Sequence, residues 1–195
     1  MKQQLKQALS QREKKRIVKP DHILAAVLVP LYYKDGQLHI LFTKRTDTVK
    51  THKGHVCFPG GGYEERDNTL LNTALRESNE EIGLSPEDIE IIGELDDIAS
   101  LATNYIISPF VSFIPWPYEF TLSSYEAERI IGVPIQVLLD RNCVNKGTEI
   151  WGGELVTAYF YQYHGDIIWG ATARILSQFL DIYVQASKNS QVKDL

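Results

Sequence analysis

Three glutamates near the middle of the chain, Glu77, Glu80 and Glu81, have a spacing that can do chemistry. They stand at i, i+3 and i+4, so on a helix they share one sector of about 100°. Like charges at this spacing destabilise an isolated helix by roughly 0.2–0.5 kcal/mol per pair. Clustered carboxylates are also ligands of hard divalent cations, and Mg²⁺ in proteins usually accompanies substrate phosphates. The spacing therefore favours a metal site for phosphate chemistry, with a solvated acidic face as the alternative.

The element that must carry these glutamates is a helix, expected over residues 69–82. Its buried face is predicted by apolar or small residues at helical spacing, namely Leu71, Ala74, Leu75, Ser78 and Ile82. Asp67 or Asn68 can cap the start of this helix, and Gly83 suits its end. The loop before the helix contains the glycines of residues 60–62, which can turn backbone carbonyls inward as further metal ligands.

Composition limits the class of protein. The chain has 195 residues, of which 44% are hydrophobic, so one domain with a full core is expected. No run approaches eighteen apolar residues, and the basic N-terminus lacks the apolar segment of a signal peptide, which together predict a cytoplasmic protein. Cys57 and Cys143 are expected to be reduced thiols. Residues 62–97 contain twelve acids and two bases, although the whole chain carries only −5.

The remaining pattern predicts a mixed α/β domain. Apolar stretches at residues 22–33 and 38–44 flank Asp35-Gly36, a strong hairpin signal. Other strands are expected at residues 89–95, 105–114, 155–163 and 167–169, and helices at 2–16, 134–140 and 173–184, with a short apolar piece at 56–58. The expected organisation is an N-terminal polar helix or extension (1–20), one catalytic domain (21–187) and a C-terminal tail (188–195).

The segment around the three glutamates resembles the motif of the Nudix hydrolases, G-x5-E-x7-R-E-U-x-E-E-x-G-U, in which U is a bulky apolar residue. Residues 76–84 match the second half of this motif, except that Ser78 stands where a bulky apolar residue is usual. In the first half Gly62 matches the glycine, but Asn68 stands at the first glutamate. Asp67 lies one residue earlier, which suggests a one-residue insertion before the helix.

Segments outside the motif resemble the coenzyme A pyrophosphatase subgroup of that family. They are residues 41–45, Lys50, Gly54, residues 58–61, 93–97, 108–111 and 168–173. Lys50 stands where this subgroup usually has Arg, which keeps the charge but loses a bidentate fork. The resemblance implies an α/β/α sandwich with a mixed β-sheet packed between helices. It also implies hydrolysis of the diphosphate of coenzyme A, or of its derivatives, to 3′,5′-ADP and 4′-phosphopantetheine.

The resemblance assigns roles to individual residues. Glu77 and Glu81 would bind the catalytic Mg²⁺ or Mn²⁺, with Glu80 as a further ligand or close neighbour and the Gly61 carbonyl completing the site. Glu80 and Glu81 are therefore also expected to be catalytic. Glu126 matches a glutamate that often precedes the final strand and activates water, although an acid at a helix N-terminus is the alternative.

Three basic residues are candidates for substrate binding. Lys44, Arg45 and Lys50 would hold coenzyme A phosphates, with a solvated strand end as the alternative. Trp169 is interpreted as a core aromatic, with a substrate platform as the other reading. The partner expected is a small nucleotide, with neither nucleic acid nor membrane, and a homodimer is a possible assembly.

Two other functions stay open. The first is hydrolysis of another nucleoside diphosphate, such as ADP-ribose, NADH or a dinucleoside polyphosphate. The second is a non-catalytic Nudix-fold binding module, but such modules usually lose a motif glutamate and all three are present here.

Overall fold

The computed structural model describes the chain except for residues 47–53, 101–102, 152–153 and 192–195. The helices are α1 (Lys2–Ser10), α2 (Leu70–Ile82), α3 (Ile135–Leu138) and α4 (Gly170–Gln191), with 3₁₀ turns η1 (Glu65–Asp67) and η2 (Pro86–Asp88). The larger sheet contains β1 (Ile23–Lys34), β2 (Gln37–Arg45), β3 (Val56–Cys57), β4 (Gly60–Gly62), β5 (Glu90–Glu94), β6 (Ile98–Ala99), β7 (Tyr105–Phe113) and β8 (Ala127–Pro134). The smaller sheet contains β9 (Val144–Trp151), β10 (Glu154–Tyr163) and β11 (Asp166–Ile168). No helix in the described part of the chain is long and apolar enough to cross a membrane.

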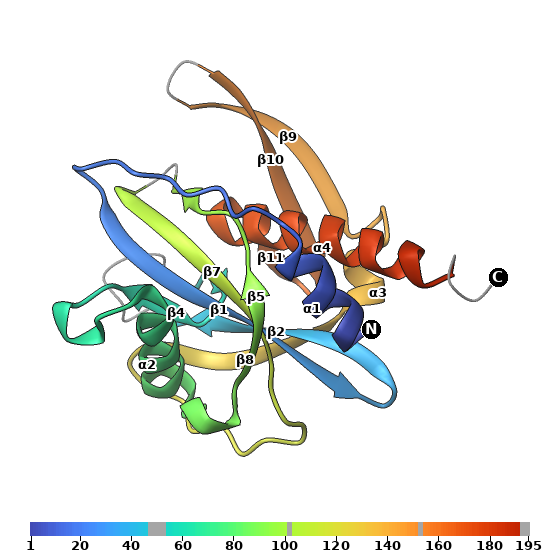
Figure 1. The fold of residues 1–195 in the computed structure, drawn as a ribbon, viewed down its shortest axis with the longest axis horizontal. Helices are drawn as coiled ribbons and strands as arrows, with labels where there is room; N and C mark the ends of the chain where they lie inside the picture. The colour runs from blue at the N-terminus through green and yellow to red at the C-terminus, as the bar shows by residue number, and fades with distance from the viewer. Residues whose placement is uncertain (47–53, 101–102, 152–153, 192–195) are drawn as a thin grey trace.

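The larger sheet is mixed and has helices on both faces. Its main strands run in the order β3-β2-β1-β7-β5, with β1 and β7 parallel and β1 and β2 antiparallel. One core cluster joins α1 and α4 to one face of this sheet, and a second joins α2 to the other face. Figure 1 shows this arrangement, with α2 on the opposite side of the sheet from α4. The expected mixed sheet packed between helices is confirmed.

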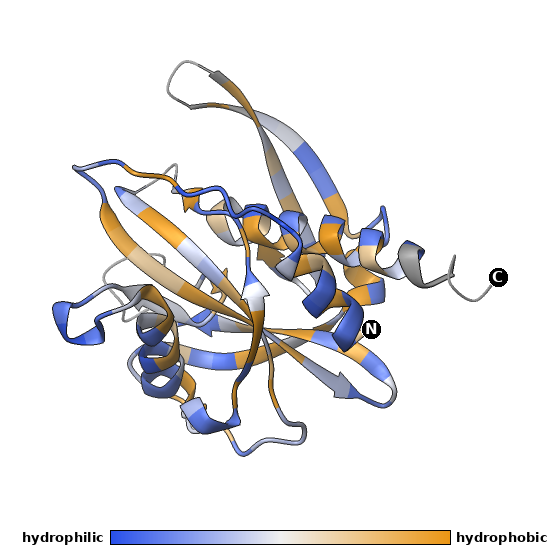
Figure 2. Ribbon diagram, viewed as in Figure 1, coloured by the Kyte–Doolittle hydropathy of each residue, from blue (hydrophilic) through white to orange (hydrophobic). Residues whose placement is uncertain are grey.

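Hydrophobic side chains follow the same division. Figure 2 shows hydrophobic residues along β1, β7 and α4, and hydrophilic residues on the visible sides of α1 and α2. The largest fully buried side chains include Phe42, Leu28 and Phe179, which come from β2, β1 and α4. The hydrophobic effect therefore holds the helices to the sheet and fixes the ends of the strands that carry the candidate site.

Two local predictions about turns and helix ends can be compared directly with the structure. Asp35 and Gly36 have φ of 51° and 75°, as a two-residue type I′ hairpin requires, so the β1–β2 hairpin is confirmed. Gly83 ends α2 in the left-handed conformation with φ of 68°, also as predicted. The predicted N-cap is wrong, because Thr69 caps α2 by accepting a hydrogen bond from the Asn72 backbone at 3.1 Å.

Several boundaries differ from those predicted. Helix α1 ends at Ser10 and α4 extends over Gly170–Gln191, and strands β8 and β9 were not predicted. In β8 the consecutive charged residues Glu128 and Arg129 are both exposed, which hides the alternation that marks a half-buried strand. In β9 a glycine and polar residues leave no apolar periodicity, so pairing with β10 rather than local pattern forms this strand.

The N-terminus is packed against the domain rather than lying beside it. Leu5 and Leu9 of α1 are buried, and Gly93 leaves room for Leu9, because a Cβ there would lie 2.6 Å from the Leu9 Cβ. The following segment, residues 11–19, is called the N-terminal arm. It pairs with acids of β5 and the turn after it: Arg12 with Asp96 at 2.8 Å, and Lys14 with Glu94 at 2.7 Å and Asp97 at 3.1 Å. Part of the acidic segment therefore binds the basic N-terminus.

The central contact of the N-terminal arm predicts a change in stability. We expect Lys14→Met to lower the free energy of unfolding by about 1–3 kcal/mol, because it leaves the largely buried Asp97 with one ion-pair partner fewer. Urea unfolding measures this change. Lys6→Met, at an exposed position of α1, serves as the control and should leave stability unchanged. Equal midpoints for the two variants would contradict the importance of the arm contacts.

Candidate active site

Helix α2 places its three glutamates at different depths. Glu81 is only 3% exposed because it shares the buried face of the helix with Ser78 and Ile82. Glu77 is partly buried, whereas Glu80 is exposed. The helix thus points Glu81 into the protein and Glu80 to solvent, with Glu77 between these two positions.

The Glu81 carboxylate lies in a pocket of polar groups. It accepts hydrogen bonds from the Gly60 backbone N–H and from Arg45 Nη1, each at 3.3 Å. The pKa of Glu81 is raised to about 8, chiefly by burial; Arg45 and the Gly60 N–H oppose the shift, and the charges of Glu126 and Glu77 add to it. A buried carboxylate surrounded by other carboxylates favours a nearby cation.

The glycine strand β4 lies directly against Glu77. A Cβ at Gly61 would lie 2.4 Å from the Glu77 Cδ, so a side chain there would displace the Glu77 carboxylate. Pairing of Gly61 with Ala26 in β1 fixes this backbone in place. Burial raises the pKa of Glu77, Arg76 lowers it, and the charges of Glu80 and Glu126 raise it. The predicted neighbours Gly61 and Glu77 are therefore brought together.

Arg76 organises the polar side of the site. Its Nη1 donates to Glu77 at 2.8 Å and to Glu80 at 2.9 Å, and its Nη2 donates to the Gly62 carbonyl at 3.1 Å. Its Nε and Nη2 also donate to the two oxygens of Asp67, at 2.7 and 3.0 Å. One guanidinium thus connects the glycine loop, η1 and two of the three glutamates.

Asp67, one residue before the expected motif position, is the acid of this turn that pairs with Arg76. Its carboxylate also accepts from the Thr73 hydroxyl at 2.8 Å and from the Glu64 backbone N–H at 3.0 Å. The Arg76 hydrogen bonds hold the pKa of Asp67 well below its usual range. The next residue, Asn68, takes up the extra length with φ of 60°. The one-residue shift therefore alters the loop and keeps the ion pair with Arg76.

Glu126 lies in the turn before β8 and belongs electrostatically to the same cluster. Its charge raises the pKa of both Glu77 and Glu81. The turn is fixed to the end of α2, since the Ser123 N–H donates to the Glu81 carbonyl at 2.9 Å and the Glu126 N–H to the Ser123 carbonyl at 3.0 Å. The alternative of a helix N-terminal acid is wrong, because no helix begins here.

The three predicted basic residues are not gathered at one point. Arg45 faces Glu81 on the α2 side of β2, whereas Lys44 points to the other side and lies 3.4 Å from Asp166 Oδ1. Lys50, like His52, lies outside the described residues. Asp166 was not singled out from the sequence. It is buried and pairs with Arg129 at 2.5 Å. The local sequence signal that could have pointed to Asp166 is its place at the start of a short strand, directly after a glycine turn.

The donor set of carboxylates and the Gly61 backbone suits a divalent cation. Within the described ranges, no three His, Cys, Asp or Glu side chains converge as a metal site. Arg76 engages Glu77, and Arg45 engages Glu81. The carboxylates of Glu77 and Glu126 nevertheless repel that of Glu81, and a hard cation would relieve this repulsion. The Gly61 backbone lies directly against Glu77. Mg²⁺ keeps several waters and needs few carboxylates, so this set suits Mg²⁺ or Mn²⁺.

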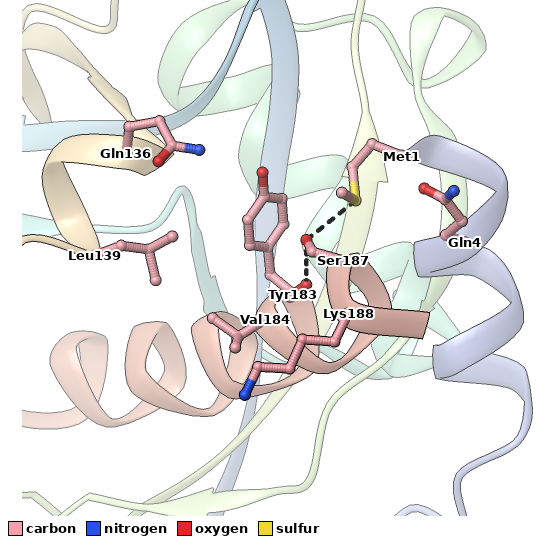
Figure 3. A pocket seen from close by; sticks show the side chains of 8 residues that line it. All are labelled: Met1, Gln4, Gln136, Leu139, Tyr183, Val184, Ser187 and Lys188. Carbon is pink, nitrogen blue, oxygen red and sulfur yellow. Dashed lines mark hydrogen bonds between the residues drawn. The ribbon is translucent and has the colours of Figure 1, made fainter. Parts of the chain in front are cut away.

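A cavity separate from the carboxylate cluster lies among helices α1, α3 and α4. It has a volume of about 470 Å³ and is lined by residues of α1, α3 and α4, with Tyr183, Ser187 and Met1 at its centre (Figure 3). The Ser187 hydroxyl donates to the Tyr183 carbonyl at 2.8 Å within it. None of its lining residues belongs to the carboxylate cluster.

Comparison with known proteins gives concordant results. The NUDIX domain family matches residues 22–121. An uncharacterized Nudix hydrolase, NudL, of Photorhabdus laumondii is 32% identical over 154 residues, which cover 79% of this chain and 81% of that protein. Nudix hydrolase 22, chloroplastic, of Arabidopsis thaliana is 36% identical over 170 residues, or 83% of this chain and 55% of that protein. A MutT/nudix family protein from Enterococcus faecalis is similar in fold, with a TM-score of 0.57 and 17% identity over 90% of this chain and 66% of that one.

The ion pair between Asp67 and Arg76 predicts a pH-dependent contribution to stability. We expect Asp67→Asn to lower the free energy of unfolding by about 1–3 kcal/mol at pH 7. Because the pKa of Asp67 is lower in the folded protein than its unfolded value of about 3.9, this contribution is complete above about pH 5. It decreases as the pH falls below the unfolded value and is lost only as the pH falls through the lower folded value, so the difference between the two proteins should be smaller at pH 3 than at pH 7 without vanishing.

Urea unfolding at several pH values measures this difference. Glu65→Gln, an exposed acid of the same turn, is the matched control and should have little effect at any pH. A difference between wild type and Asp67→Asn that stays constant from pH 7 to pH 3 would show that the charge of Asp67 does not stabilise the fold.

Proposed function

The chain belongs to the Nudix family of hydrolases, which act on pyrophosphate bonds, and we propose that its substrate is coenzyme A or one of its derivatives. The products would be 3′,5′-ADP and 4′-phosphopantetheine. The observation that carries the catalytic part is the cluster of Glu77, Glu81 and Glu126 beside Gly61. The choice of coenzyme A is supported by the resemblance of several segments outside the motif to the coenzyme A pyrophosphatase subgroup.

In this proposal Glu77, Glu81 and the Gly61 carbonyl hold Mg²⁺ or Mn²⁺, and Glu80 is a further ligand or close neighbour. When bound, the ion neutralises charge on the diphosphate and lowers the pKa of water at the site. Arg76 keeps Glu77 and Glu80 oriented through its hydrogen bonds to both carboxylates. It acts as a positioning residue and is not proposed to touch substrate.

The remaining residues are proposed to accept the proton of the attacking water and to bind the phosphates of the substrate. Glu126 is proposed to accept the proton of the attacking water, since its carboxylate is close enough to Glu77 and Glu81 for its charge to act on both. Arg45 already neutralises part of the charge of Glu81 and, with Lys44 and Lys50, is proposed to bind substrate phosphates. For Lys44 and Arg45 this requires sharing their present carboxylate partners with the substrate.

Other expectations stay predictions. These are the domain limits at residues 21 and 187, a cytoplasmic location, the absence of nucleic-acid and membrane partners, and a homodimer. Light scattering at micromolar concentration tests the last of these. A dimer mass would support it, and a monomer mass would overturn it.

The proposed substrate is tested with a panel of compounds. We expect coenzyme A or an acyl-CoA to be hydrolysed faster than ADP-ribose, NADH or Ap4A in the presence of Mg²⁺ or Mn²⁺, with products identified by mass. Glu81→Gln should reduce turnover by about 100-fold or more while keeping the fold, because burial already favours the uncharged form of this side chain. Fast ADP-ribose cleavage without coenzyme A cleavage would refute the substrate. Near wild-type activity of Glu81→Gln would refute the metal assignment.

The contact between Gly61 and Glu77 gives a second test of the catalytic arrangement. We expect Gly61→Ala to reduce kcat by about 100-fold, because its Cβ would displace the Glu77 carboxylate. Gly62→Ala is the matched control, since a Cβ there meets no atom within 4 Å. Circular dichroism should show the same fold for both variants. Equal activity of the two would contradict a role for the Glu77 position.

A further inference from the structure

We propose that Trp169 and His55 form an aromatic subsite that stacks the adenine base of the nucleotide half of the substrate. The inference rests on the proposed function, because it takes the substrate to be an adenine nucleotide. The rings of Trp169 and His55 lie 4.7 Å apart between centroids with an angle of 60° between their planes. Trp169 is 40% exposed, and Ile167, on the same face two residues earlier, is 46% exposed. The two residues present apolar and aromatic surface to solvent.

This aromatic pair lies beside the carboxylate cluster. The His55 carbonyl accepts a hydrogen bond from the Arg45 backbone N–H at 2.9 Å, and the Arg45 side chain reaches Glu81 at 3.3 Å. His55 also shares a face of the β3 region with Cys57, because alternate residues of a strand point the same way. Burial and the charge of Glu81 raise the pKa of the Cys57 thiol to about 11. His55 therefore stands on the side of β3 that faces Glu81.

Trp169 is held in position by the strand that it follows. Asp166, at the start of β11, pairs with Arg129 of β8 and with Lys44 of β2, so two ion pairs join the smaller sheet to the larger one. At the other end of β11, Ile168 pairs with Tyr161 and is buried in the core. With both ends of β11 anchored, the ring of Trp169 needs little ordering when a ligand binds, which favours affinity.

The aromatic surface of Trp169 and His55 suits the adenine base of the substrate better than its pantetheine arm. A nucleobase presents a flat π face to an aromatic ring, and such stacking is worth about 1–3 kcal/mol per base. The pantetheine arm has amide groups and no ring. A base on Trp169 also places the diphosphate toward Arg45, whose backbone N–H donates to the His55 carbonyl and whose side chain reaches Glu81.

The kinetic test uses the full chain with Mg²⁺. We expect Trp169→Ala to raise the KM for the hydrolysed nucleotide about 5- to 100-fold, with kcat changed less than about threefold. Trp169→Phe keeps a stacking ring and should change KM less than about threefold. A loss confined to kcat, or an equal rise of KM in both variants, would overturn the stacking role.

A spectroscopic test needs no catalysis. We expect 3′,5′-ADP to quench the tryptophan fluorescence of the wild type, and 4′-phosphopantetheine, which has no base, to leave it unchanged. Trp169→Phe should lose this quenching although it still binds. Trp116→Phe is the matched control and should keep it, because Trp116 stacks on Tyr32 in the core beside α2. Quenching that persists in Trp169→Phe would place the base elsewhere and overturn the proposal.

The two tests separate the subsite from the proposed substrate. If coenzyme A is not hydrolysed but 3′,5′-ADP still quenches Trp169, the choice of coenzyme A fails and the adenine subsite stands. If coenzyme A is hydrolysed but neither KM nor quenching depends on Trp169, the subsite fails and the proposed function stands.

Discussion

The guanidinium of Arg76 holds together the parts on which the candidate site depends. It bonds to Asp67 in the turn before α2, to Glu77 and Glu80 on the helix, and to the Gly62 carbonyl of the glycine strand. A rigid fork of five donors suits this task, because one planar group can bind several carboxylates in fixed directions. These bonds fix the position of the glycine strand relative to the helix.

The acidic segment of the chain serves two separate purposes. Its helical part supplies the glutamates of the cluster, whereas its later part, around Asp96 and Asp97, binds the basic N-terminal arm. The local excess of negative charge is thus divided between the carboxylate cluster of the candidate site and a surface neutralised by the protein's own Arg12 and Lys14. In both parts the acids lie close to basic side chains, and opposite charges attract strongly over such short distances.

The sequence predicts those features that depend on local pattern. The β1–β2 hairpin, the end of α2 at Gly83 and the position of Glu77 beside Gly61 could be predicted from turn residues, helical spacing and a family motif. Strands β8 and β9 and the docking of the N-terminal arm could not, because they depend on partners far away in the chain. The depth of Glu81 was also missed, since spacing gives its direction on the helix and not what covers it.

Asp67 stands one residue before the acidic position of the family motif, yet it pairs with Arg76 through two hydrogen bonds. The next residue, Asn68, has a positive φ. A search for related chains by fixed residue intervals would reject a sequence of this kind at its first acidic position. A search by distance, for a carboxylate within about 3 Å of the guanidinium Nε, would accept it. In this loop the contact between Asp67 and Arg76 is defined by their distance in space, which a fixed interval along the chain does not capture.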